Sequence, residues 1–482
     1  MRHRRRGGIA ALLGAALAMG AIGCGSSSST PDGGSLSDGA VTADGPAGTD
    51  GGVGGDRGAT GDRGPATEGG PTADKGAPSP DGGGGPAPTK IDQVAAGKSF
   101  TCVIFDTKEV RCWGYNSSGQ LGYATTVSGI GHQSTPKQYG KMVKIGGKVT
   151  QLALGDAHAC ALLDTGKVRC WGGGALGRLG YGNTNNVGLT NHPADVGDVD
   201  LGGAVKQLSA GANHTCALMT DAKVRCWGEC AWGQCGIPGQ VAAGPIGDNE
   251  KPSAVAPMEM GVDVEKVAAG GQHTCLLLKG GKVRCFGEGE WGRLGYGDQL
   301  DIKEKKPSEL KDVDVGGEVV DLQAGNYNTC ALIKGGALRC WGAGNLGVTA
   351  NAGQHVGDNE APSAVAAIKV GALVTSFSIS STGSHICAVT DAQNLRCWGS
   401  GQTGKLGYAA IADIHDPSAK GDVKVGETVL GVAAGGNHSC ALTSKNQVRC
   451  WGSASAAQLG YGNATTIGDT ETPDTAGDVP VF

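Results

Sequence analysis

Aromatic residues and long helical patterns are scarce in this sequence. Aromatic side chains make up 4% of the 482 residues, whereas glycine occurs 89 times. No helical periodicity extends beyond about two turns, and short alternating runs bounded by turn signals fill the chain instead. This combination predicts an all-β protein.

Motifs of catalysis and of nucleotide binding are absent as well. The sequence contains no G-x-S-x-G, no phosphate-binding loop, no H-E-x-x-H and no pair of carboxylates at a recognisable catalytic spacing. The formal net charge is −5 and no basic stripe is present, which disfavours nucleic acid as a partner. We therefore expect a protein that is not an enzyme, with no cofactor and no metal.

Residues 1–23 have the features of an export signal. A basic start precedes a twelve-residue apolar run, residues 9–20, which is too short to span a bilayer. The junction Ala-Ile-Gly-Cys24 resembles the bacterial lipoprotein cleavage box. That resemblance implies that Cys24 becomes the lipidated first residue, and Gly25 favours the outer membrane, on its periplasmic or cell-surface side. An ordinary signal peptide with an incidental cysteine is the alternative.

Residues 24–90 are predicted to be a disordered tether. They are rich in Gly, Ser, Pro, Thr and Asp and almost free of large apolar side chains. Such a segment cannot bury enough surface to fold. The folded part is therefore expected over residues 91–482.

A unit with two cysteines ten positions apart recurs seven times in that part. The second cysteine is preceded by arginine and followed by an aromatic residue and glycine, and successive copies lie 53 to 59 residues apart. A repeat of this length indicates one architecture that is tiled along the chain. The pairs are Cys102 with Cys112, Cys160 with Cys170, Cys216 with Cys226, Cys275 with Cys285, Cys330 with Cys340, Cys387 with Cys397, and Cys440 with Cys450.

Each pair is predicted to be a disulfide across a β-hairpin. In the second copy, Asp164-Thr165-Gly166 forms a turn that places Cys160 opposite Cys170 on neighbouring strands. A metal site would need clusters of four ligands, and this spacing is not that of a zinc ribbon. Disulfides of this kind persist only in an oxidising compartment, in agreement with export.

The repeat also resembles a known family. The pattern A-G-x-x-H-[TSA]-C-A-L, then V-R-C-W-G, then L-G-Y-G is similar to the regulator of chromosome condensation (RCC) repeat, and residues 115–123 match its last part. The resemblance implies a seven-bladed β-propeller that presents a broad face to protein partners. Two features depart from the family pattern: the paired cysteines, and the loss of three residues between Trp341 and Leu346.

The C-terminal residues are expected to close the ring. Residues 477–482 match residues 197–202, which come just before the third copy. We predict that they form a strand that completes the blade begun by the first copy and so removes an open sheet edge.

Two polar positions recur with the repeat. The first is the position two residues before the first cysteine of each pair, which holds histidine in five copies. The favoured interpretation is that this side chain bonds backbone groups at its own turn. A ring of histidines that binds a metal or senses pH is the alternative. The second, an arginine, shares a strand face with the aromatic residue two positions later and is predicted to stack on aromatic rings between blades; a sugar- or anion-binding ring is the alternative. The first position holds His158, His214, His273, His385 and His438, with Phe100 and Asn328 in the other two copies. The arginines are Arg111, Arg169, Arg225, Arg284, Arg339, Arg396 and Arg449.

Three copies contain Gly-Asp-[Asn/Thr]-Glu-x-Pro, at residues 247–252, 357–362 and 468–473. The Asp, Asn and Glu side chains carry the oxygen ligands that Ca²⁺ prefers, so a calcium site is the alternative interpretation. An exposed turn is the favoured interpretation.

The third copy contains an additional pair, Cys230 and Cys235, with Trp232 between them. We predict a local disulfide, because a thioredoxin-type redox motif has two intervening residues rather than four. The pinned Trp232 and the matching Trp291 of the fourth copy are the candidate binding residues.

The sequence thus predicts a lipid-anchored, extracytoplasmic, monomeric propeller that acts as a non-catalytic scaffold for a protein partner. Binding of a cell-surface carbohydrate or of peptidoglycan is the alternative, which exposed aromatics in a groove would favour. Guanine-nucleotide exchange by family analogy and a propeller enzyme have less support, since no residue constellation indicates either.

Overall fold

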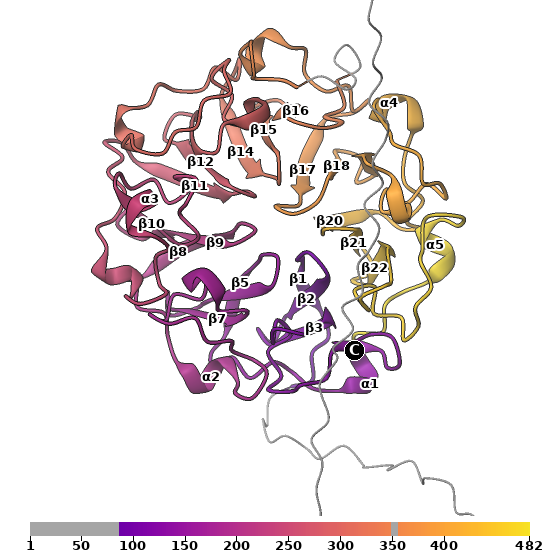
Figure 1. The fold of residues 1–482 in the computed structure, drawn as a ribbon. Helices are drawn as coiled ribbons and strands as arrows, with labels where there is room; N and C mark the ends of the chain where they lie inside the picture. The colour runs from indigo at the N-terminus through magenta and orange to yellow at the C-terminus, as the bar shows by residue number, and fades with distance from the viewer. Residues whose placement is uncertain (1–85, 349–354) are drawn as a thin grey trace, which may run out of the picture. The chain divides into compact units, whose positions relative to one another are not determined.

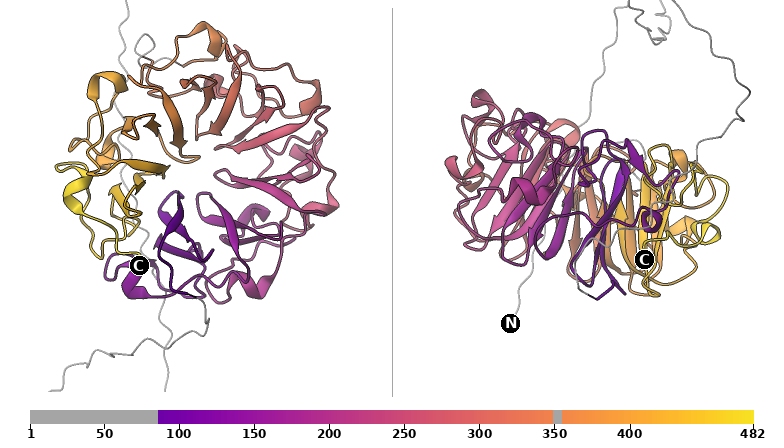
Figure 2. Two further views of the ribbon diagram at one scale, coloured as in Figure 1. Left: turned by 180° about the vertical axis from the view of Figure 1, so that it is seen from behind. Right: turned by 90° about the horizontal axis from the view of Figure 1, so that it is seen from below.

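Seven antiparallel sheets, the blades, are arranged around a central axis (Figure 1). The structure is a computed structural model and describes residues 86–348 and 355–482. Each repeat forms one blade, and seen from the side the strands run between the two faces of the ring (Figure 2). The all-β, seven-bladed architecture predicted from the sequence is confirmed.

The strands follow the repeat. In blade 1 they are β1 (Ile91–Ala96), β2 (Phe100–Phe105), β3 (Val110–Tyr115) and β4 (Gly129–Ile130); in blade 2, β5 (Val149–Leu154), β6 (His158–Leu163) and β7 (Val168–Gly172); in blade 3, β8 (Val205–Ala210), β9 (His214–Met219) and β10 (Val224–Gly228); in blade 4, β11 (Val264–Ala269), β12 (His273–Leu278) and β13 (Lys282–Gly287). In blade 5 they are β14 (Val319–Ala324), β15 (Asn328–Ile333) and β16 (Ala337–Gly342); in blade 6, β17 (Val374–Ile379), β18 (His385–Thr390) and β19 (Leu395–Gly399); in blade 7, β20 (Val429–Ala434), β21 (His438–Thr443) and β22 (Val448–Gly452).

The helices that the structure describes are short and lie in the connections between blades. The four-residue α-helices are α1 (Pro136–Tyr139), α2 (Pro193–Val196), α3 (Gln240–Ala243), α4 (Pro417–Lys420) and α5 (Pro473–Ala476). Three-residue 3₁₀ turns are η1 (Ala175–Gly177), η2 (Pro252–Ala254), η3 (Glu290–Gly292), η4 (Pro307–Glu309), η6 (Pro362–Ala364) and η7 (Gln402–Gly404). None of the described helices has the length and apolar character needed to cross a bilayer.

The hairpin of the second and third strands has the predicted register. Cys160 pairs directly with Cys170 and Leu162 with Val168, and Gly166 takes a φ of 76° in the turn. The same register recurs in every blade, because the spacing between the two cysteines never varies.

All seven predicted hairpin disulfides are present, with Cα atoms 4.0–4.1 Å apart. The middle strand of every blade is buried along its whole length. These disulfides therefore lie in the core. They join Cys102 to Cys112, Cys160 to Cys170, Cys216 to Cys226, Cys275 to Cys285, Cys330 to Cys340, Cys387 to Cys397, and Cys440 to Cys450.

The first strands of the blades line a central cavity of about 360 Å³. Glutamine side chains in this wall bond the backbone of the next blade. Gln151 donates from Nε2 to the Leu208 carbonyl (3.0 Å) and accepts from the Leu208 amide (2.9 Å). Gln207 makes the same pair of bonds to Val267. The polar groups of this wall therefore serve to join blades.

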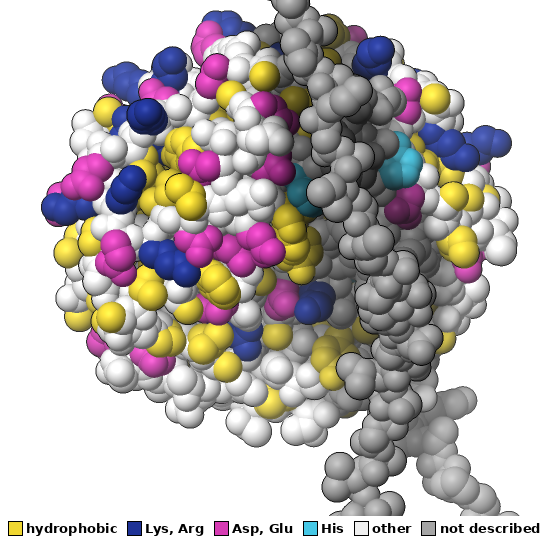
Figure 3. All heavy atoms as spheres, turned by 45° about the horizontal axis from the view of Figure 1, so that its top comes forward, with side chains coloured by type: hydrophobic (Ala, Val, Ile, Leu, Met, Phe, Trp, Pro, Cys, Tyr) yellow, Lys and Arg dark blue, Asp and Glu magenta, His cyan; other side chains and the backbone are white. Residues whose placement is uncertain are grey.

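The ring has two different faces. The turns between first and second strands, and the loops after third strands, lie on what we call the upper face; the hairpin turns between second and third strands lie on the lower face. The chain enters β1 from the lower face, where Asn446 of blade 7 accepts from the Ile91 amide (2.9 Å) and Thr89 bonds Asp106 of blade 1 (2.7 Å). On the face shown in Figure 3, outside the grey residues, acidic and basic side chains are interspersed.

The C-terminal residues 477–482 form no strand, so that detail of the prediction is wrong. The Val479 amide makes one bond to the Val448 carbonyl of its own blade (2.8 Å), as Val199 does to Val168 (2.8 Å), and the matching residues 197–202 form no strand either. The Val481 carbonyl accepts from Arg111 of blade 1. This segment therefore takes the place that the connecting segments occupy between other blades.

Blade 7 and blade 1 are joined by the contacts that join other neighbours. His438 bonds Thr101 (2.8 Å), and Trp113 donates to the Gln458 carbonyl (2.9 Å). The Gly462 amide bonds the Gly131 carbonyl (2.8 Å). Each blade is thus built from one uninterrupted stretch of chain.

Candidate functional site

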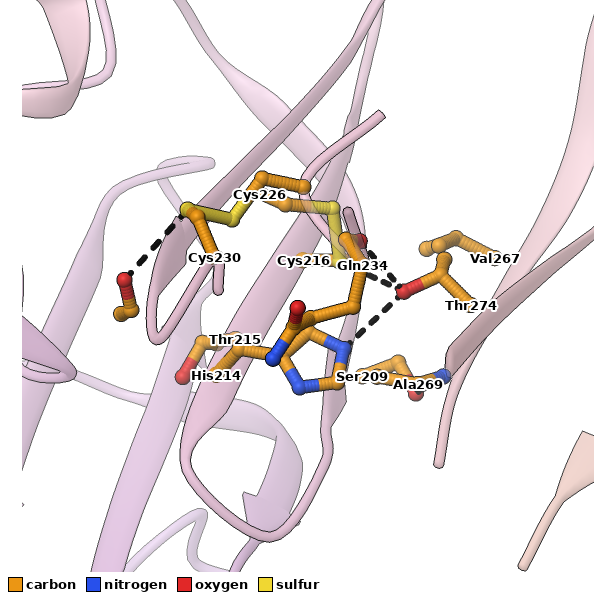
Figure 4. The surroundings of a disulfide bond; sticks show 12 residues. Ser209, His214, Thr215, Cys216, Cys226, Cys230, Gln234, Val267, Ala269 and Thr274 are labelled. Atoms are coloured by element: carbon orange, nitrogen blue, oxygen red, sulfur yellow. Dashed lines mark hydrogen bonds between the residues drawn. A yellow bond between two sulfur atoms is a disulfide. The ribbon is translucent and has the colours of Figure 1, made fainter. Parts of the chain in front are cut away.

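The repeated histidines are buried at the junctions between blades. His214 bonds through Nε2 to Thr274 of the next blade (2.9 Å), and Thr274 donates its own proton to the Gln234 carbonyl (2.8 Å; Figure 4). The hydroxyl oxygen must therefore accept, so Nε2 carries the proton of the neutral ring. Equivalent bonds of 2.8–2.9 Å join His158, His273, His385 and His438 to Thr215, Thr329, Ser439 and Thr101.

Burial keeps these histidines neutral. It lowers the pKa of His214, His385 and His438 to about 3, and the pKa values of His158 and His273 lie well below the ordinary value. Among the residues that the structure describes, no group of three or more side chains could hold a metal ion. The favoured interpretation was right that these residues have a structural role, but wrong about the partner, which is a hydroxyl on the next blade.

The glycine of the Gly-x-x-His motif is explained by the same contact. A Cβ on Gly155 would collide with the His158 ring and with the Gly211 carbonyl of blade 3. Only glycine lets the turn approach both groups this closely.

The repeated arginines bond backbone carbonyls, and of the seven only Arg111 lies over an aromatic ring, that of Phe105 in its own blade (5.6 Å), so the predicted stacking between blades is wrong. Arg169 donates to the Ile145 carbonyl and pairs through Nε with Asp198 (2.9 Å). The guanidinium has five donors and satisfies carbonyls that are otherwise left unpaired between blades. The framework tryptophan acts separately, since Trp171 donates from Nε1 to the Gln120 carbonyl of the preceding blade (3.0 Å).

The Gly-Asp-[Asn/Thr]-Glu-x-Pro segments form turns. In the first of them the Gly247 amide donates to Glu250 within the motif (3.2 Å). Asn249 is exposed and Glu250 is half-buried. One carboxylate oxygen of Glu250 thus closes the turn, in agreement with the favoured interpretation as a turn.

Trp232 and Trp291 belong to one side-chain network on the upper face of blades 3 to 5. With the Gln272 amide assigned in the orientation that satisfies both neighbours, Trp232 donates from Nε1 to its oxygen (2.7 Å) and its nitrogen donates to Glu288 (2.6 Å). Glu288 is paired with Arg293. We call the set Trp232, Gln272, Glu288, Arg293, Trp291 and Tyr327 the tryptophan network.

Arg293 is the centre of this network. Its guanidinium carbon lies 5.2 Å from the centre of the Trp291 ring and 5.3 Å from that of Tyr327, and the two rings meet edge to face at 4.9 Å. Arg293 is fully buried, whereas Tyr327 is 41% exposed. Burial lowers the pKa of Arg293 and raises the pKa of Glu288, although each opposes the shift of the other.

Local structure fixes both tryptophans. Cys230 and Cys235 are joined as predicted, with Cα atoms 5.2 Å apart, and the Trp232 amide donates to Gln234 (2.8 Å). Trp291 lies within η3 at a φ of 59°, a conformation that is uncommon for a residue with a side chain. Both rings are half-buried rather than fully exposed, and the Lys303 ammonium lies 4.6 Å from the centre of the Trp232 ring.

Sequence analysis found the two tryptophans but missed what connects them. Gln272 and Tyr327 lie in turns between first and second strands, and Glu288 and Arg293 lie in the loop after a third strand. All four occupy positions that vary among the repeats. Their proximity follows from the packing of neighbouring blades, which the spacing within one repeat does not reveal. Cys24 lies outside the described residues.

A closed set of seven similar blades, joined by buried polar bonds and with variable loops on one face, defines a β-propeller scaffold. The RCC1-like domain family model matches residues 33–369 and, in a second alignment, residues 149–479. The chain belongs to the RCC1-like domain family.

Similar proteins have the same architecture. The ultraviolet-B receptor UVR8 of Arabidopsis thaliana is 29% identical over 388 residues, which cover 78% of this chain and 80% of that protein. Human WBSCR16 has a similar fold, with a TM-score of 0.59 and 21% identity over 76% of this chain and 94% of that one. So does Prp20p from Saccharomyces cerevisiae, with a TM-score of 0.59 and 18% identity over 81% of this chain and 87% of that one.

Proposed function

We propose that this chain is a non-catalytic scaffold that binds a protein partner through the tryptophan network. The observation that carries the proposal is the position of two half-buried tryptophans and an exposed tyrosine over a buried ion pair. Aromatic side chains held rigidly in this way are typical centres of protein interfaces. The Prp20p structure was described together with its binding to Gsp1p and histones, which supports a protein partner for this fold.

Carbohydrate binding has less support from the geometry. A sugar stacks on an open aromatic face, but the Trp232 ring already lies beside Lys303 and the Trp291 ring beside Arg293 and Tyr327. These contacts already use part of the ring surface on which a sugar would stack.

We further propose that the protein is exported and held at a membrane by lipid on Cys24. Eight disulfides among the described residues support an oxidising compartment. The chain enters the propeller at the lower face, near Thr89 and Asp106. The tryptophan network lies on the opposite, upper face of the propeller.

Partner capture with matched tyrosine variants tests the proposed binding. Tyr327 and Tyr115 both lie on the upper face, 41% and 42% exposed, but only Tyr327 belongs to the network. We expect Tyr327→Ala, Trp291→Ala and Trp232→Ala each to weaken a captured partner about fivefold or more, because an interface anchor is lost. Tyr115→Ala should bind as the unchanged chain does.

The partner is first captured with the full chain and identified by mass spectrometry. The dissociation constant between this partner and each purified variant is then measured. Circular dichroism shows whether each variant is folded. Equal affinities for all four variants would overturn the proposed site, and catalytic turnover by the purified chain would overturn the scaffold function.

A further inference from the structure

Three cations lie beneath the upper face at one position of the repeat, the residue before the Leu-Gly pair. They are Arg178, Arg293 and Lys405, in blades 2, 4 and 6. The first two have acidic neighbours. Arg293 pairs with Glu288 and lies 3.9 Å from Glu290. Arg178 bonds Asn213 (2.6 Å), and nearby Asp156 and Glu229 act to raise its pKa.

Lys405 is the exception, because it is buried without a counter-charge. It is 3% exposed, and its ammonium bonds only the neutral oxygens of Ser384 and Asn437, both at 3.3 Å. No carboxylate of the described residues lies within 4.0 Å of it. Burying an uncompensated ammonium is unfavourable.

The acidic positions of the other blades hold serine here. Ser400 stands where Glu288 stands in blade 4, and Ser453 stands where Glu229 stands in blade 3. Burial lowers the pKa of Lys405, and the charge of Asp413 opposes this shift. The Asp413 carboxylate already accepts from the Gly401 amide and from Asn345, both at 2.9 Å. The fold therefore leaves one positive charge on this part of the upper face unneutralised.

The groups that cover Lys405 lie at the surface. Ser384 and Asn437 are both exposed. Ser384 belongs to the turn between β17 and β18, which has five residues, residues 380–384, where the turn between β20 and β21 has three, residues 435–437. A ligand that approaches the upper face between blades 6 and 7 meets these two polar side chains first and the ammonium directly behind them.

We infer that Lys405, with Ser384 and Asn437, binds a carboxylate group of the partner protein, an inference that rests on the proposed function. One carboxylate neutralises one ammonium, and the Ser384 hydroxyl and the Asn437 amide supply donors for its second oxygen. A phosphate dianion would bring excess negative charge into a site that already faces Asp413. The partner is thus expected to place an aspartate or glutamate at blades 6 and 7 while it packs apolar surface on the tryptophan network.

Acetate is the probe that tests this subsite without the partner. Thermal unfolding of the full chain is measured at pH 7 in sodium chloride, sodium acetate and sodium phosphate of equal ionic strength. Acetate should raise the Tm of the unchanged chain by about 1 °C or more over chloride, because a ligand of the folded state stabilises it. Lys405→Met and Lys405→Gln should lose this rise.

Lys98→Met is the matched control, because Lys98 lies on the same face but is already paired with Asp156 (2.9 Å). It should keep the acetate response. Equal responses in all variants, or no response in the unchanged chain, would overturn the subsite. A larger response to phosphate than to acetate would overturn the choice of carboxylate. None of these outcomes involves Trp232 or Trp291, so a failure here is separate from a failure of partner capture.

Discussion

A histidine and a hydroxyl on neighbouring blades occur together or not at all in this chain. Five junctions have the pair. At the other two, Phe100 precedes a blade with Ala159, and Asn328 precedes a blade with Ile386. A buried imidazole without an acceptor for its proton is unfavourable, so the loss of one partner is matched by the loss of the other.

This pairing predicts the behaviour of variants at the junction of blades 3 and 4. Thr274→Val leaves the His214 proton without an acceptor and should lower the free energy of unfolding by about 1–3 kcal/mol. Adding His214→Phe to Thr274→Ala recreates the combination of Phe100 and Ala159, and the double variant should be less destabilised than the sum of its single changes. Urea unfolding curves measure all of these.

Thr184→Val serves as the control, since Thr184 is exposed, and it should change stability little. Strict additivity of His214→Phe and Thr274→Ala would show that the two side chains do not depend on each other.

At the scale of the residue, sequence analysis predicted the partners of the cysteines correctly but not those of the histidines. The invariant spacing showed that Cys160 must face Cys170, because both belong to one hairpin. The partner of His158 is Thr215, 57 positions away in another blade. A periodic sequence shows that such residues recur, but the contact depends on how blades are offset, which hairpin geometry does not determine.

The element that joins the ends of the ring is a connecting segment rather than a strand. Val479 and Val481 are buried, and the Val481 carbonyl accepts from Arg111, which is itself buried. The match of residues 477–482 to residues 197–202 therefore predicted correctly that the C-terminal segment lies between two neighbouring blades. The expected strand is absent from both segments, each of which makes a single valine amide bond to the third strand of the blade it leaves, so the match indicated a connecting segment rather than a strand.

Deleting residues 479–482 should destabilise the propeller. The change removes two buried valines, each worth about 1.5–3 kcal/mol, and leaves Arg111 without its carbonyl acceptor. We expect a lower Tm in calorimetry and more aggregation in light scattering.

Deletion of Phe482 alone is the control, because this ring is 38% exposed and should contribute less. A truncated chain that melts like the full chain would show that this segment does not stabilise the junction of blades 7 and 1.

At the scale of the whole molecule, the proposed lipid anchor on Cys24 predicts where the propeller is found in the cell. Cys24→Ser should move the protein from the membrane fraction to the soluble fraction, because the proposed lipid attachment requires the thiol. Immunoblots of fractionated cells measure this, and Ser28→Ala is the control that should remain at the membrane. A Cys24→Ser protein that stays with the membrane would contradict lipid anchoring.

The number of blades followed from the seven cysteine pairs, but the tryptophan network did not. Its members come from three successive blades, and only Trp232 and Trp291 were predicted, because Trp232 lies between the additional cysteines and Trp291 occupies the matching position of the next repeat. Tyr327 and Gln272 occupy turns where every copy differs. A residue that occurs in only one copy cannot be recognised by comparing the repeats of one chain. Such residues are seen to form a group only once the structure shows that they lie close together.

Because each blade is one continuous stretch of chain, the blade at which the sequence starts can be changed. The Lys90 carbonyl accepts from the Asp106 amide (2.9 Å), and the aromatic ring of Phe482 lies 5.5 Å from that of Phe105. The first and last segments of the propeller therefore meet at one hairpin, that of β2 and β3. No blade shares strands between the two ends of the described chain. A circular permutant that links these ends and opens the chain in another connection would keep all seven blades whole, and it would let the attachment point of the tether be moved around the lower face.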